Sequence, residues 1–118
     1  DLKDRGLLDT TLVVCVGEFG RTPTISPLPN QKVPGRHHWA AVYSALFAGG
    51  GTRPGQIIGA SDNIGGQPIT TPYHPNVMGA TIYDSLGINP ATMIKDRLGR
   101  PVHLNTGSVM DVLYNGAG

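Results

Sequence analysis

The sequence predicts an α/β fold, and three features indicate it. Residues 11–16 form a short, continuous, β-branched apolar run, typical of a central parallel strand covered on both faces. Residues 76–86 repeat apolar side chains at steps of three and four, as an amphipathic helix does. A long polar segment follows the strand directly, and open α/β sheets place their ligand sites at that carboxyl edge.

The opening residues are typical of the last turn of a helix. Lys3 and Arg5 suit the negative end of a helix dipole, and Gly6 is placed to adopt the left-handed conformation of a helix cap. The sequence begins with Asp1 rather than with methionine. We therefore expect a fragment whose first helix starts outside this sequence.

Two segments after the predicted strand differ in character. Residues 20–38 are rich in proline and glycine, which predicts a long loop without regular structure. Residues 40–48 are apolar and end at three consecutive glycines. Ala and Leu favour a helix there, whereas the short length and the glycines favour a strand, and periodicity does not decide between them.

The second half contains the clearest helix. Residues 56–60 are a further candidate strand, and the turn-rich residues 61–66 fit a hairpin at a sheet edge. Pro75 opens the predicted helix at 76–86 and Gly87 closes it. A polar turn is expected at residues 96–101.

Composition limits the classes of function. With 118 residues, 39% of them hydrophobic, the chain is long enough for one core. Nine Lys and Arg against eight Asp and Glu give a net charge of +1, which disfavours nucleic acid and anionic membranes as partners. No apolar run approaches the roughly 18 residues that a membrane span needs. The single cysteine, Cys15, lies in an apolar run and has no partner for an intrachain disulfide.

Glu18 and Arg21 lie just beyond the predicted strand. One interpretation is a surface ion pair between them, which contributes little to stability. The other is a metal ligand, Glu18, beside an anion contact, Arg21, because hard divalent ions prefer carboxylate oxygens and arginine matches phosphate or sulfate with two parallel hydrogen bonds.

His37 and His38 end the predicted loop. Adjacent histidines in a strand point to opposite faces, so at most one of them faces a site. Such a pair is more commonly exposed or held in the core. With Glu18 at the neighbouring edge, the other interpretation is a carboxylate and imidazole site whose remaining ligands come from elsewhere. Ser44 and Cys15 have no acid–base partner at a recognisable spacing, so the sequence offers no nucleophile.

Four blocks of sequence carry a family resemblance. They are residues 17–23 (GEFGRTP), 35–39 (GRHHW), 48–51 (AGGG) and 59–62 (GASD). Together they resemble the C-terminal part of the domain of unknown function 1501 family, which is similar to sulfatases and alkaline phosphatases. Residues 80–90 also resemble the helix and turn that end the catalytic domains of sulfatases and cofactor-independent phosphoglycerate mutases.

The resemblance implies a three-layer α/β/α sandwich of the alkaline-phosphatase-like type, of which residues 1–118 would be the C-terminal portion of a single domain. It implies a strand at residues 42–48. By analogy Glu18 and His38 would be ligands of a divalent metal such as zinc, calcium or magnesium, and Arg21 and His37 would contact an anionic substrate. The parent protein would be a metal-dependent hydrolase of phosphate or sulfate esters of a small molecule or polysaccharide, in the periplasm or secreted.

One departure leaves an alternative open. The family usually reads Gly-Arg-Asp-His-Trp, and His37 stands where that Asp is expected. An imidazole in place of a carboxylate changes the charge of the site by about one unit. The alternative is a non-catalytic exported binding or structural protein, which the sequence does not separate from a bacterial surface or assembly module.

Overall fold

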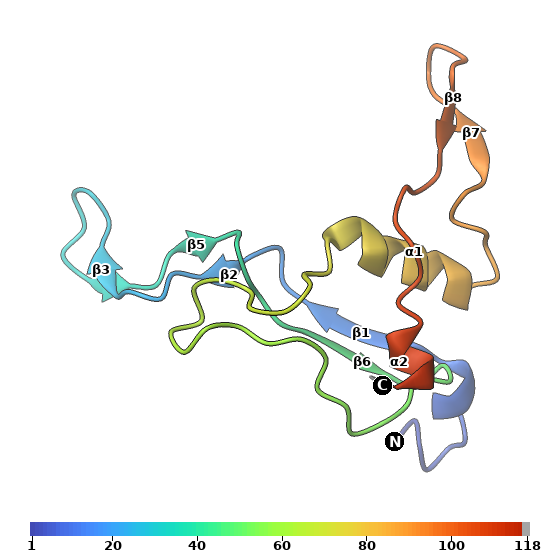
Figure 1. Ribbon diagram of the computed structural model, residues 1–118, viewed down its shortest axis with the longest axis horizontal. Helices are drawn as coiled ribbons and strands as arrows, with labels where there is room; N and C mark the ends of the chain where they lie inside the picture. The colour runs from blue at the N-terminus through green and yellow to red at the C-terminus, as the bar shows by residue number, and fades with distance from the viewer. Residues whose placement is uncertain (117–118) are drawn as a thin grey trace. The chain divides into compact units, whose positions relative to one another are not determined.

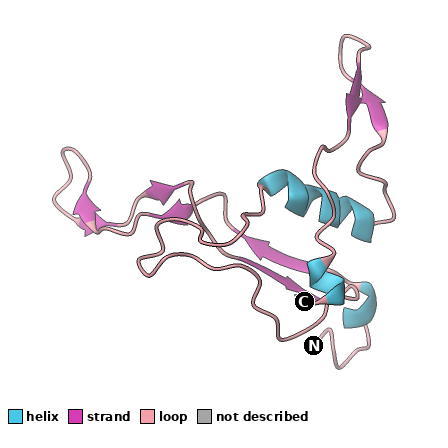
Figure 2. Cartoon of the chain, in the orientation of Figure 1, coloured by secondary structure: helices cyan, strands magenta, loops and turns pink. Residues whose placement is uncertain are grey.

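The computed structural model describes residues 1–116, and in these residues loops and turns outweigh helices and strands (Figures 1 and 2). The chain divides into two compact units. The first unit comprises Asp1–Val13, Phe47–Gln56 and the chain from Tyr73 onward, and the second comprises Val14–Leu46 and Ile57–Pro72. No helix among the described residues is long and apolar enough to cross a membrane.

The first unit is organised around helix α1 (Pro75–Ser85). Pro75 occupies the start of the helix, where the missing N–H has no intrahelical partner to lose. Gly87 has a φ of 73°, and Ile88 N donates to Tyr83 O across it, which is the hydrogen bond of a glycine-terminated helix. The predicted helix at 76–86 is confirmed to within one residue.

Few side chains of the first unit are buried. Ala80 and Thr81 of α1 are fully buried, and Met110 and Leu113 are nearly so. The Thr81 hydroxyl donates to Val77 O at 2.8 Å and accepts a hydrogen bond from Met110 N at 3.0 Å. This threonine therefore ties α1 to the segment before helix α2 (Val112–Asn115).

A hairpin that the sequence pattern did not predict follows α1. Strands β7 (Met93–Lys95) and β8 (Pro101–His103) pair antiparallel, with Ile94 opposite Val102. Asp96 closes the turn, because its carboxylate accepts hydrogen bonds from the amides of Leu98 and Arg100. The expected polar turn is present, and the strands on either side of it are new.

The second unit contains an antiparallel arm where a loop was expected. Strand β2 (Gly20–Arg21) pairs with β5 (His38–Trp39), and β3 (Ser26–Pro27) pairs with β4 (Pro34–Gly35) (Figure 1). Thr22 N donates to His37 O between the two pairs. Residues 20–39 therefore form a hairpin with short strands, although the composition predicted no regular structure there.

Strand β1 (Val13–Val16) pairs with β6 (Ala45–Ala48) in a two-stranded sheet. The pairing confirms strand rather than helix for part of the ambiguous run at 40–48. The candidate strand at 56–60 was wrong, because only an isolated bridge, between Ser61 and Pro68, forms next to it.

The prediction of a three-layer α/β/α sandwich was wrong. The strands are two to four residues long and are arranged in two-stranded sheets, and α1 is the only helix of more than one turn among residues 1–116. A parallel layer needs helices over both of its faces. Here Cys15 and Val16 of β1 are exposed, so the apolar run that predicted a covered central strand is instead part of an open ribbon.

Candidate anion-binding site

The arm of the second unit holds the candidate site in place. Arg21 lies opposite His38 in the β2–β5 register. The Thr22 hydroxyl accepts a hydrogen bond from His37 N at 3.0 Å and donates to Thr24 O at 3.0 Å. The strand pairing at Arg21 and these bonds just after it fix the local backbone, so the base of the Arg21 side chain has a defined position.

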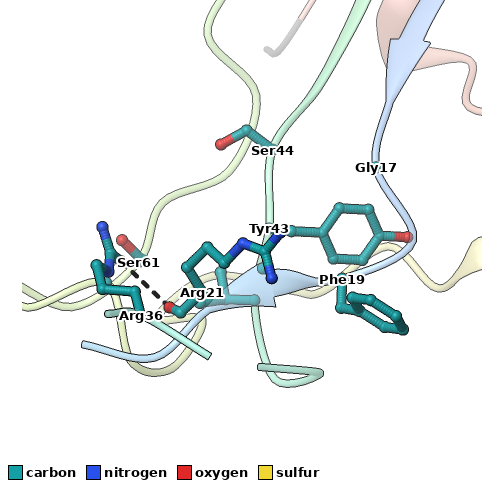
Figure 3. A pocket seen from close by; sticks show the side chains of 10 residues that line it. Gly17, Phe19, Arg21, Arg36, Tyr43, Ser44 and Ser61 are labelled. Atoms are coloured by element: carbon teal, nitrogen blue, oxygen red, sulfur yellow. Dashed lines mark hydrogen bonds between the residues drawn. The ribbon is translucent and has the colours of Figure 1, made fainter. Parts of the chain in front are cut away.

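Arg36 crosses the arm and binds the opposite strand. Its Nε donates to Thr22 O at 2.6 Å, and one of its terminal nitrogens donates to Arg21 O at 3.1 Å, the bond drawn in Figure 3. The guanidinium keeps further N–H donors beyond these two bonds. Arg36 therefore stabilises the arm and still presents donors and a positive charge to solvent.

Both arginines line an open pocket with a volume of about 350 Å³. Figure 3 shows the polar side chains that share it: Arg21, Arg36, Tyr43, Ser44 and Ser61. No carboxylate lines the pocket, and neither guanidinium forms an ion pair with any residue from 1 to 116. The pocket thus combines two guanidinium groups that form no ion pair among residues 1–116 with three hydroxyl groups.

Gly20 lets two backbone segments meet at this pocket. A Cβ atom at Gly20 would collide with the carbonyl oxygen of Val42 and would lie 3.1 Å from that of Trp39. Only glycine allows this approach, which brings the segment carrying Tyr43 and Ser44 to the strand that carries Arg21.

The other residues singled out by the sequence lie outside this pocket. The ring of His38 is exposed and stacks on Phe19, with centroids 4.1 Å apart and planes inclined by 27°. Glu18 is exposed next to Phe19. The ring of His37 is half-buried, and its Nε2 lies 2.7 Å from Ser26 O, so this imidazole supports the arm.

Sequence reasoning found Arg21 and missed the rest of the pocket. Arg36 precedes the histidine pair directly, and an antiparallel pairing of the two family blocks would have placed it near Arg21. Tyr43, Ser44 and Ser61 come from separate segments with no common pattern. Only the tertiary structure brings them together.

Within residues 1–116, no three His, Cys, Asp or Glu side chains lie close enough together to hold a metal ion. Glu18 and His38 would supply two donors at most, whereas structural and catalytic zinc sites use three or more protein ligands. The described residues do not make a complete metal site.

The fold and the site define a small, hairpin-rich chain with a cationic surface pocket. The chain belongs to the family described as protein of unknown function DUF1501, whose model matches residues 1–113. Among curated proteins and among solved structures, nothing matches the chain.

Proposed function

We propose that the pocket around Arg21 and Arg36 binds the anionic group of a phosphate or sulfate ester. One observation carries the proposal: two arginines and three hydroxyl groups line a pocket that contains no carboxylate. A tetrahedral oxyanion accepts several hydrogen bonds at once, and arginine presents parallel N–H groups that match two of its oxygens.

The two arginines have different roles in anion binding, because their contacts differ. Arg36 is anchored by two carbonyl groups, so its guanidinium is pre-organised and loses little side-chain entropy on binding. Arg21 is exposed and makes no side-chain hydrogen bond within the described residues, so it is free to close on the anion. Tyr43, Ser44 and Ser61 add neutral donors around it.

We propose further that this binding serves a metal-dependent hydrolase of such esters. The support is the resemblance of the family to sulfatases and alkaline phosphatases, together with the two arginines that line the pocket. In this proposal Glu18 and His38 supply two ligands to a divalent metal, which would act as a Lewis acid toward the ester. The remaining ligands and the nucleophile would come from groups that this sequence does not contain.

A second candidate is binding without hydrolysis. His37 stands where the family usually has Asp, and its ring contacts Ser26 O, so the position supports the arm here. Within residues 1–116, neither Ser44 nor Ser61 has a carboxylate or imidazole hydrogen-bond partner that would activate it.

Anion binding is tested by calorimetric titration of the chain with inorganic sulfate, inorganic phosphate and phenyl phosphate. Arg21→Gln should raise the Kd about tenfold, since a hydrogen bond to a charged group contributes about 1.5 kcal/mol or more. Arg97→Gln is the matched control, because Arg97 is exposed and does not line the pocket. Equal affinity in wild type and Arg21→Gln would refute the proposed site.

Hydrolysis is tested separately on the parent protein that supplies the remaining ligands and the nucleophile, with 4-nitrophenyl phosphate and sulfate in the presence of zinc, calcium or magnesium. Metal content by plasma mass spectrometry is compared between wild type, the Glu18→Gln/His38→Gln variant and the control His74→Gln, whose exposed ring makes no capping hydrogen bond at α1. Metal and turnover lost only in the double variant support the hydrolase. Anion binding without metal or turnover supports the second candidate.

A further inference from the structure

The second unit has another hollow, with a volume of about 430 Å³. Trp39, Pro23 and Ile64 provide its apolar lining. Thr24, Ser26 and Gln67 are among the polar side chains around it. We call this hollow the Trp39 groove.

The groove is pre-organised by hydrogen bonds beneath it. Trp39 Nε1 donates to Gly66 O at 2.7 Å, which fixes the indole ring. The Asp62 carboxylate accepts hydrogen bonds from Gly66 N at 2.6 Å and from Gln67 N at 3.1 Å. Hydrogen bonds to the Asp62 carboxylate and to the indole therefore hold the turn that forms one wall of the groove. Because this wall is already ordered, ligand binding costs little conformational entropy.

Three polar side chains at the groove are available to a ligand. The hydroxyls of Thr24 and Ser26 and the side-chain amide of Gln67 make no hydrogen bond to any residue from 1 to 116. No lysine or arginine lines the groove, and Asp62 is its one charged residue. The negative charge of the Asp62 carboxylate disfavours anions. Both of its oxygens already accept backbone hydrogen bonds, so it is a weaker ligand for a cation.

We infer that the Trp39 groove binds a neutral sugar ring. A pyranose has a face of C–H groups, which suits an indole, and a rim of hydroxyl groups, which suits neutral donors and acceptors. An apolar wall with a few placed polar groups is the usual form of a small-molecule site. This inference is separate from the proposed function. The arginine pocket is proposed to bind an anionic group, whereas the Trp39 groove would bind an uncharged sugar.

Trp39 is the single tryptophan of the chain, so its fluorescence reports on the groove directly. The chain is titrated with maltose, cellobiose, lactose and N,N′-diacetylchitobiose. At least one of them should give a saturable shift of the emission, with a Kd on the order of 1 mM for so small a site. Gln67→Ala and Thr24→Val should each raise that Kd about fivefold or more, since each removes a hydrogen bond while keeping the tryptophan.

Gln31→Ala is the control, because this exposed glutamine lies outside the groove. Circular dichroism establishes that each variant is folded. The inference is overturned if none of the four sugars shifts the Trp39 emission. It is also overturned if Gln67→Ala and Thr24→Val bind sugar with the same Kd as wild type. Arg21→Gln should leave sugar binding unchanged, so failure of the anion pocket and failure of the sugar groove give different results.

Discussion

The close approach at Gly20 gives the sharpest prediction about the site. In Gly20→Ala the new Cβ would collide with Val42 O and would lie 3.1 Å from Trp39 O. Both obstacles are backbone atoms, so no change of side-chain rotamer relieves the overlap. Either the β2–β5 pair or the segment around Val42 must move, and both line or support the arginine pocket.

The expected cost follows from this geometry. Forcing a methyl group into a closely packed site costs about 1–3 kcal/mol. For a chain of this length, a loss of that size lowers the Tm by about 4–12 °C. Gly35→Ala is the matched control, because a Cβ at this strand glycine meets nothing within 4 Å. Its effect should be neutral, or stabilising by about 0.4–1 kcal/mol through the unfolded state.

Thermal unfolding of the two variants, followed by the fluorescence of Trp39, is the assay. Trp39 is opposite Gly20 in the register, so its emission in the folded state should also change in Gly20→Ala and not in Gly35→Ala. The sulfate affinity of Gly20→Ala should fall as well, because the pocket loses its shape. The reasoning fails if the two variants shift the Tm equally and bind sulfate equally.

Two further predictions concern the first unit. Thr81→Val removes two hydrogen bonds and leaves Met110 N buried without an acceptor, so it should cost about 1–3 kcal/mol, whereas Thr81→Ser keeps the hydroxyl and should cost about 1 kcal/mol. Urea unfolding compares them, and a Val variant as stable as wild type would contradict the role given to this hydroxyl. The amide and then the guanidinium of Arg100 hold the pKa of Asp96 below its usual 3.8. Because the folded pKa is the lower one, the stabilisation is complete above about pH 3.8 and is lost as the pH falls through the lowered value. NMR titration of the β7–β8 amides should show this acid loosening in wild type and not in Asp96→Asn.

The sequence by itself determined the local elements whose signals are short-range. Pro75 and Gly87 bound α1. Residues 2–6 are turns rather than a helix, but Gly6 has a φ of 67° and Leu7 N donates to Leu2 O across it, which is the geometry expected of a helix-ending glycine. These features depend on φ preferences and on hydrogen bonds between near neighbours, so residues close in sequence decide them. The sequence also singled out Arg21, from its place just after the predicted strand, and Arg21 lines the pocket.

Tertiary structure decided the layer architecture and the composition of the site. The apolar run of β1 is typical of a covered strand, yet coverage depends on which other segments pack on it, and Cys15 and Val16 are exposed. Arg36 joins Arg21 only because the proline-rich segment between them folds back as an antiparallel arm. Ser61 reaches the same pocket from far along the chain. Backbone hydrogen bonds across the arm and the close approach at Gly20 create these long-range pairings. The spacing of residues along the sequence therefore does not predict them.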